Sequence, residues 1–92
     1  MPYIGEEYRE LLKGELNDLL KVLYAIPNNT LEGVVNYVIT RVIDSLYHTA
    51  SYKDYNTAVG ILECVKQEFY RRRISLYEDR KSKENGDVYN GY

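Results

Sequence analysis

The sequence predicts an all-α fold, a three-helix antiparallel bundle with a long C-terminal helix. Two observations support this prediction. Apolar residues recur at steps of three and four along three long segments, and short turns containing Pro, Asn or Ser separate the segments. Because the turns are short, consecutive helices are expected to run antiparallel. Ninety-two residues correspond to one domain, which we place at residues 1–86, followed by an extended tail at residues 87–92.

The first predicted helix covers residues 6–24. Its apolar residues follow the spacing of one helix face: Tyr8, Leu11, Leu12, Leu16, Leu19, Leu20 and Leu23. Glu6 and Glu7 lie in the first turn, where the helix dipole favours negative charge. The helix is expected to end before Pro27, because a proline disfavours helical backbone at the residue that precedes it.

The second predicted helix covers residues 30–47, with Asn29 as its cap and Glu32 three residues later, as in a capping box. Its many β-branched residues would also suit a strand. The helical alternative fits better, because the polar residues Asn36, Thr40 and Asp44 recur every four positions. More than half of the circumference is apolar, so this helix is expected to be the most buried.

The third predicted helix covers residues 52–84. Ser51 followed by Asp54 predicts a capped start, and Asn85-Gly86 predicts the end. Its apolar stripe comprises Tyr55, Ala58, Val59, Leu62, Val65 and Phe69. Two ion pairs at i,i+4 spacing, Glu68–Arg72 and Asp79–Lys83, are expected on its polar side.

Packing of the three apolar faces predicts a core and an association surface. The residues expected to be nearly fully buried are Leu16, Val38, Val42, Leu62 and Val65. At about 1.5 Å per residue the third helix is about 50 Å long, against about 28 Å for each of the others. The third helix therefore extends beyond the other two, and a homodimer would cover the apolar residues of this extension. Two alternatives are a bend near Arg73, which would fold the last segment back as a fourth helix, and an end that stays in solvent.

Composition narrows the class of protein. The net charge of −2 gives no case for general binding to nucleic acid or to a membrane surface. No apolar run approaches the roughly 20 residues that span a bilayer, and the start lacks the pattern of a signal peptide. The single Cys allows no internal disulfide and suits a reducing compartment. We therefore expect a cytoplasmic protein.

One charged cluster is the candidate binding site, and it lies late in the third helix. Its residues are Tyr70, Arg71, Arg72, Arg73, Tyr77 and Lys81. Guanidinium groups bind phosphates and anionic protein surfaces, and tyrosine rings stack on bases. Consecutive helical residues point about 100° apart, however, so three arginines form a broad collar rather than a clamp. The alternative interpretation is a solvated helix face with acidic neighbours such as Glu68 and Glu78.

Residues typical of enzymes are present, but they do not form a site. Helical nucleotide pyrophosphatases bind magnesium through ExxE and ExxD motifs on two helices. Here Glu7-x-x-Glu10 and Glu15-x-x-Asp18 lie on one predicted helix, so their oxygens would not converge. His48 suits a helix C-terminus better than a general base, and Cys64 is expected to be a buried thiol. The sequence therefore predicts no enzyme, no cofactor and no metal.

Several short stretches together resemble a known group of proteins. They are Met1-Pro2-Tyr3-Ile4, residues 60–72, Tyr77-Glu78-Asp79-Arg80-Lys81 and residues 84–89. Across nearly the whole chain these resemble a family of short uncharacterised proteins from phages and from microbial and environmental genomes. The resemblance implies a viral or mobile-element context, hence a host cytoplasm, and supplies no mechanism. Relatives carry a Pro before the position of Tyr77, so the helix is expected to continue here where theirs bend.

Two functional hypotheses arise from these observations. The first is a non-enzymatic accessory protein that binds a protein partner as a homodimer, through its tyrosine-rich third helix and tail. The second is a protein that binds or sequesters a nucleotide-like anion, with Arg71, Arg72, Arg73 and Lys81 on the phosphate and Tyr70 or Tyr77 on the base.

Overall fold

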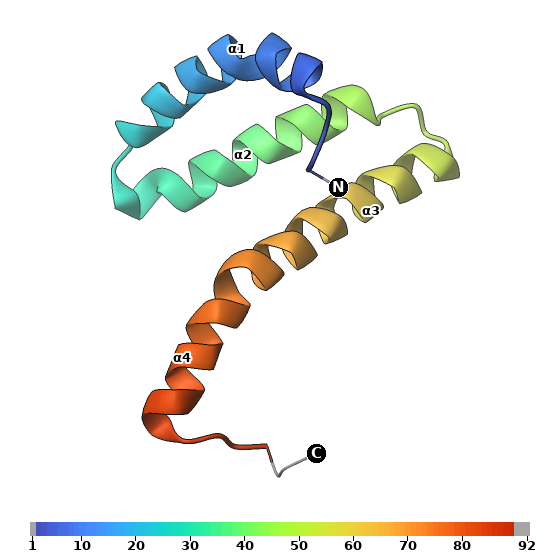
Figure 1. Cartoon of the computed structure of the whole chain (residues 1–92). Helices are drawn as coiled ribbons and strands as arrows, with labels where there is room; N and C mark the ends of the chain where they lie inside the picture. The colour runs from blue at the N-terminus through green and yellow to red at the C-terminus, as the bar shows by residue number, and fades with distance from the viewer. Residues whose placement is uncertain (1, 90–92) are drawn as a thin grey trace. The chain divides into compact units, whose positions relative to one another are not determined.

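The computed structural model describes residues 2–89, and every regular element in them is a helix. The elements are α1 (Glu6–Tyr24), α2 (Asn28–Leu46), α3 (Tyr52–Phe69), the π-helical segment η1 (Tyr70–Ile74) and α4 (Ser75–Asn85) (Figure 1). The all-α prediction of three helices, the last of them long, is confirmed, because α3, η1 and α4 succeed one another without a break. The chain forms two units, residues 2–58 and 59–89, which meet within α3.

Helix α1 has the predicted bounds. Glu6 and Glu7 occupy its first turn and Lys21 its last, as the helix dipole favours at each end. The backbone N–H groups of Ala25 and Ile26 donate to the carbonyls of Val22 and Leu23, each at 3.1 Å. This tighter turn satisfies carbonyls that would otherwise lack a partner at the helix end.

Helix α2 begins two residues earlier than predicted, and the expected capping box is wrong. Pro27 takes the N-cap position with an extended backbone and no side-chain cap, so Asn29 is already helical. A proline immediately before the first turn is tolerated because the N–H it lacks has no partner in a helix start. At the other end the His48 ring donates from Nδ1 to the Asp44 and Ser45 carbonyls, at 3.0 and 3.1 Å. The predicted role of His48 at this end is confirmed.

Helix α3 starts with the predicted cap. The Ser51 hydroxyl accepts a hydrogen bond from the Asp54 N–H at 3.1 Å. Thr49 Oγ1 in turn donates to the Asp54 carboxylate at 2.7 Å. These two bonds join the connecting loop to the first turn of the helix.

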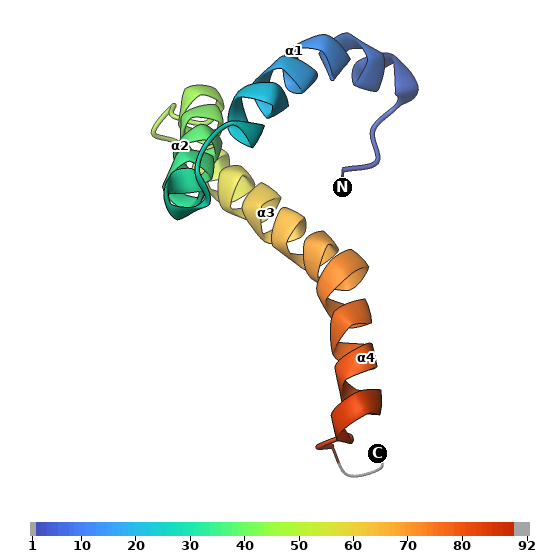
Figure 2. The ribbon, with the colours of Figure 1, turned by 90° about the vertical axis from the view of Figure 1, so that its left-hand side faces the viewer.

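The long helix contains one feature that the sequence did not predict, the π-helical segment η1. The N–H of Ser75 reaches back to the carbonyl of Tyr70, five residues earlier. Figure 2 shows the ribbon bending between α3 and α4, as helices do at such segments. The helix then ends as predicted at Gly86, which has a φ of 91° and donates to the Ser82 carbonyl at 2.9 Å.

The ion pairs differ from the predicted ones. Glu68 pairs with Arg71 rather than Arg72, and neither Asp79 nor Lys83 takes part in an ion pair among residues 2–89. Three ion pairs among residues 2–89 have i,i+3 spacing: Glu63–Lys66, Glu68–Arg71 and Lys81–Glu84. Residues three apart are also neighbours on a helix surface, so the polar side is stabilised in an equivalent way.

The predicted core is wrong for the single chain. Among the described residues only Ala58 is buried, at 6% exposure. Val38 is half-buried, and the other four predicted core residues are between 42% (Leu62) and 59% (Val65) exposed. The physical reason is that few residues of different helices contact one another; within residues 2–58, α1 and α2 make only a small contact. The apolar faces exist as predicted, but the single chain leaves them open.

The Ser51 cap generates a first prediction. Ser51→Ala removes the acceptor of the Asp54 N–H and should lower the free energy of unfolding by about 1 kcal/mol. Urea denaturation monitored by far-UV circular dichroism measures the change. Ser45→Ala, in the last turn of α2, is the matched control and should change stability by less than about 0.5 kcal/mol. Equal effects of the two variants would show that the cap contributes nothing.

Candidate partner-binding surface

Exposed apolar side chains gather in a stripe on each helix, and these stripes are the main candidate site. On α1 the stripe includes Leu12, Leu16, Leu19 and Leu20. On α2 it includes Val35, Ile39, Val42 and Leu46, at steps of three and four. In residues 59–89 it includes Leu62, Val65 and Phe69 of α3. Contiguous exposed apolar side chains make these stripes candidates for an interaction surface.

The predicted anion site spreads over two elements. Tyr70, Arg71, Arg72 and Arg73 lie on η1, and Tyr77 and Lys81 lie on α4. The anion-binding hypothesis placed Arg71, Arg72, Arg73 and Lys81 on a phosphate and Tyr70 or Tyr77 on a base, and the structure shows a contact between two of these residues. The Lys81 Nζ lies 5.7 Å from the centre of the Tyr77 ring, a cation–π contact.

The three arginines do not converge on one point. Arg71 donates from Nη2 and Nε to the half-buried carboxylate of Glu68, so it is already engaged by an anion. Arg72 and Arg73 are exposed, and neither forms an ion pair with any residue between 2 and 89. Successive side chains around a helix point in different directions. Helix geometry therefore still favours a broad collar over a phosphate clamp, as predicted from the sequence.

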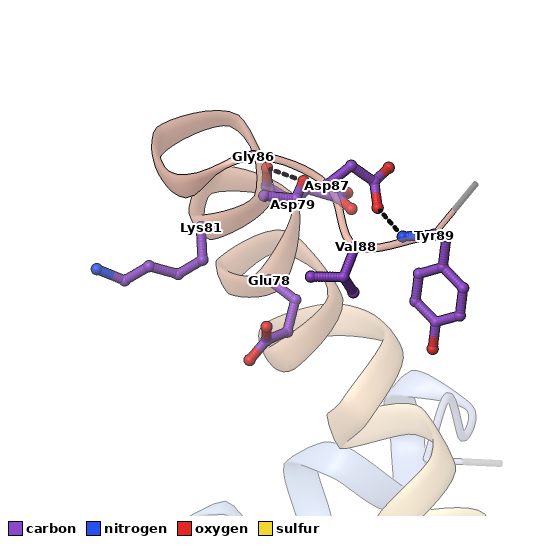
Figure 3. Close-up of a pocket in the computed structure, with 8 residues that line it drawn as sticks. Glu78, Asp79, Lys81, Gly86, Asp87, Val88 and Tyr89 are labelled. Atoms are coloured by element: carbon purple, nitrogen blue, oxygen red, sulfur yellow. Dashed lines mark hydrogen bonds between the residues drawn. The ribbon is translucent and has the colours of Figure 1, made fainter. Parts of the chain in front are cut away.

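A cavity of about 380 Å³ lies at the end of α4, where sequence reasoning placed no site (Figure 3). It forms because the chain turns at Gly86 and runs back beside the helix, with the Tyr89 N–H donating to the Asp87 carboxylate at 2.9 Å. Its lining residues are Glu78, Asp79, Lys81, Ser82, Gly86, Asp87, Val88 and Tyr89. Lys81 alone belongs to the predicted set, and Figure 3 shows its amine pointing away from Val88 and Tyr89.

The charge of this cavity argues against an anionic ligand. Three carboxylates, from Glu78, Asp79 and Asp87, line it against the single amine of Lys81. The same Lys81 amine lies 3.3 Å from the carboxylate of Glu84. Like charges disfavour a phosphate here, so the cavity does not replace the arginine cluster as an anion site. The only sequence signal for it was the predicted helix end at Asn85-Gly86.

Side chains typical of catalysis are dispersed. In the described part of the chain, no group of three or more His, Cys, Asp or Glu residues could hold a metal ion. Cys64 is exposed, which corrects the prediction of a buried thiol. Gln67 donates to the Glu63 carboxylate and Lys66 lies beside it, which together lower the pKa of Glu63. Both interactions are local contacts of the α3 surface.

Membrane insertion by a helix finds no support in residues 2–89, because none of their helices is both long enough and apolar enough to cross a bilayer. The exposed apolar stripes alternate with charged residues along every helix. Such amphipathic helices cover one another in proteins.

Comparison with known proteins places the chain in a family. No curated protein and no solved structure matches it. A family model described as a domain of unknown function, DUF6899, matches residues 1–88. That match includes all five helical segments and the turn at Gly86. Since the match covers nearly the whole sequence, the chain belongs to the DUF6899 family.

Proposed function

We propose that the protein is a non-enzymatic accessory protein, of viral or mobile-element origin, that acts in the host cytoplasm by binding a protein partner as a homodimer. The observation that carries this proposal is the exposed apolar surface. Each of α1, α2 and α3 presents large apolar side chains to water, and of the described residues only Ala58 is buried. Burying one such side chain contributes about 1.5–3 kcal/mol, so these faces favour association.

A second copy of the chain would bury apolar surface that these faces expose, because permanent homodimers bury about 1,000–2,500 Å² on each partner. A dimer also doubles the number of helices around a core that one chain of this size fills poorly.

The chemistry of the surface suits reversible binding. Eleven tyrosines combine apolar area with a hydroxyl that is satisfied by water or by a partner. Tyr55, Tyr70 and Tyr77 are each about half exposed, and Tyr89 lies in the tail beyond α4. Such residues are enriched at protein interfaces. The tyrosine-rich long helix and the tail beyond it would therefore contact both a second copy of the chain and a protein partner.

Self-association is the second prediction. Light scattering on the full chain at tens of micromolar should give twice the chain mass of 10.8 kDa, and dilution should return the mass toward one chain. Phe69→Asp, on the exposed stripe of α3, should give the monomer mass at the same concentration. Asn56→Asp, a polar position of the same helix, is the control and should keep the dimer. A wild-type chain that stays monomeric throughout contradicts the proposal.

An anion-binding function is the alternative, and the exposed Arg72 and Arg73 are the observation in its favour. Against it stand the engagement of Arg71 by Glu68 and the splayed directions of the three side chains. Arg71, Arg72, Arg73 and Lys81 would have to meet one phosphate group, with Tyr70 or Tyr77 on a base. Tyr77 and Lys81 are in contact, with the amine 5.7 Å from the ring centre.

A thermal-shift assay with adenine and guanine nucleotides and with cyclic dinucleotides separates the two functions, as the third prediction. We expect no rise in the unfolding midpoint. A true ligand at 100 times its dissociation constant would add about 2.7 kcal/mol. A rise that Arg72→Ala/Arg73→Ala abolishes, and that the control Lys21→Ala in α1 preserves, would favour the anion-binding function instead.

A further inference from the structure

Helix α4 differs from the other α-helices in having no apolar face. Its apolar side chains, Leu76 and Tyr77, are adjacent in the first turn, and every residue from 78 to 85 is polar or charged. A helix that is polar on all sides gains little from packing, whatever surface lies beside it. Most helical stability in proteins comes from burying an apolar face, so α4 lacks the main source of that stability.

Local contacts stabilise α4 instead. The Lys81 amine lies 5.7 Å from the centre of the Tyr77 ring and 3.3 Å from the Glu84 carboxylate. At the end of the helix the Gly86 N–H donates to the Ser82 carbonyl at 2.9 Å. Contacts between residues three or four apart add little to the stability of a helix. Helix α4 has 11 residues, whereas isolated helices shorter than roughly 12–15 residues are only marginally stable in water.

The π-helical segment η1 separates α4 from the helix that precedes it. In an α-helix each N–H donates to the carbonyl four residues earlier, and the unbroken repetition of this bond makes a long helix cooperative. Across η1 the pattern changes, because the Ser75 N–H donates to the Tyr70 carbonyl five residues earlier. The ribbon bends at this segment (Figure 2). The hydrogen bonds of α3 therefore stabilise α4 less than they would in an uninterrupted helix.

We propose that α4 is a conditional helix, one that unfolds and refolds separately from α3 with η1 as the boundary. Proteins open locally in contiguous units, and a segment that passes between order and disorder is a common switching device. A partner that contacts such a segment supplies the stability that the isolated helix lacks. The inference rests on the proposed function, protein binding through the long helix, and deepens it by naming the part of that helix which orders on binding.

Amide hydrogen exchange of the full chain, followed residue by residue by NMR, tests this proposal. Amides of residues 79–85 should be protected less than about tenfold relative to an unfolded chain, because the helix opens readily. Amides of residues 60–69 in α3 should be protected at least about thirtyfold more strongly than those of α4. Equal protection of the two segments, whether high or low, would show that they open together and would contradict the proposal.

Deletion of Arg72 tests the role of η1. With one residue fewer the π turn closes into an α turn, and α3 and α4 become one continuous α-helix, so protection of residues 79–85 should rise at least about fivefold. Arg72→Ala is the matched control. It removes the same side chain but keeps the number of residues, and it should change this protection by less than about twofold, since Arg and Ala have similar helix propensities. Deletion of Arg73 is an equivalent variant, and far-UV circular dichroism checks that each variant is folded.

Light scattering on the same samples separates this inference from the proposed function. A dimeric chain in which α3 and α4 are equally protected contradicts the conditional helix and leaves the homodimer standing. A monomeric chain in which α3 is protected and α4 is not contradicts the homodimer and supports the conditional helix. If α4 exchanges fast in the wild-type chain and equally fast in both folded deletion variants, η1 is not the boundary and the proposal is contradicted.

Discussion

Exposure of apolar side chains to water is the constraint on which the behaviour of this chain depends. Three amphipathic helices form, large apolar side chains on each of them are exposed, and residues of different helices make few contacts. Isolated helices of this length are only marginally stable in water, because most helical stability in proteins comes from packing of the apolar face. Covering of the apolar faces is therefore the condition for stable helices in this chain.

Local sequence signals predicted the helices well, because these signals act within a few residues. The bounds of α1 were predicted to the residue. The Ser51 cap and the stop at Gly86 depend on hydrogen bonds that one side chain or one glycine determines. The start of α2 was predicted two residues too late, because Pro27 and Asn29 both suit the start of a helix. In the structure Pro27, with its fixed φ, takes the N-cap position.

Burial was not predictable in the same way. Leu16, Val42 and Leu62 have the periodicity of core residues, but periodicity shows only that a face is apolar and not which surface covers it. The π turn at Tyr70–Ile74 also escaped prediction, since the five residues contain no proline or glycine and all of them tolerate a regular helix. For the arginine cluster, the sequence predicted a broad collar, which stays a prediction. It could not show that Glu68 would engage Arg71 or that a cavity would form beside Gly86.

The most direct test of the central claim is whether folding and association are one process. If a second copy covers the apolar faces, the thermal unfolding midpoint must rise with protein concentration, because mass action stabilises whatever binds only in the folded state. Circular dichroism melts of the wild-type chain over a hundredfold range of concentration measure this dependence. The account predicts a midpoint that rises steadily across the range. A cooperative transition whose midpoint does not change with concentration would show that one chain covers its own apolar faces and would contradict the account.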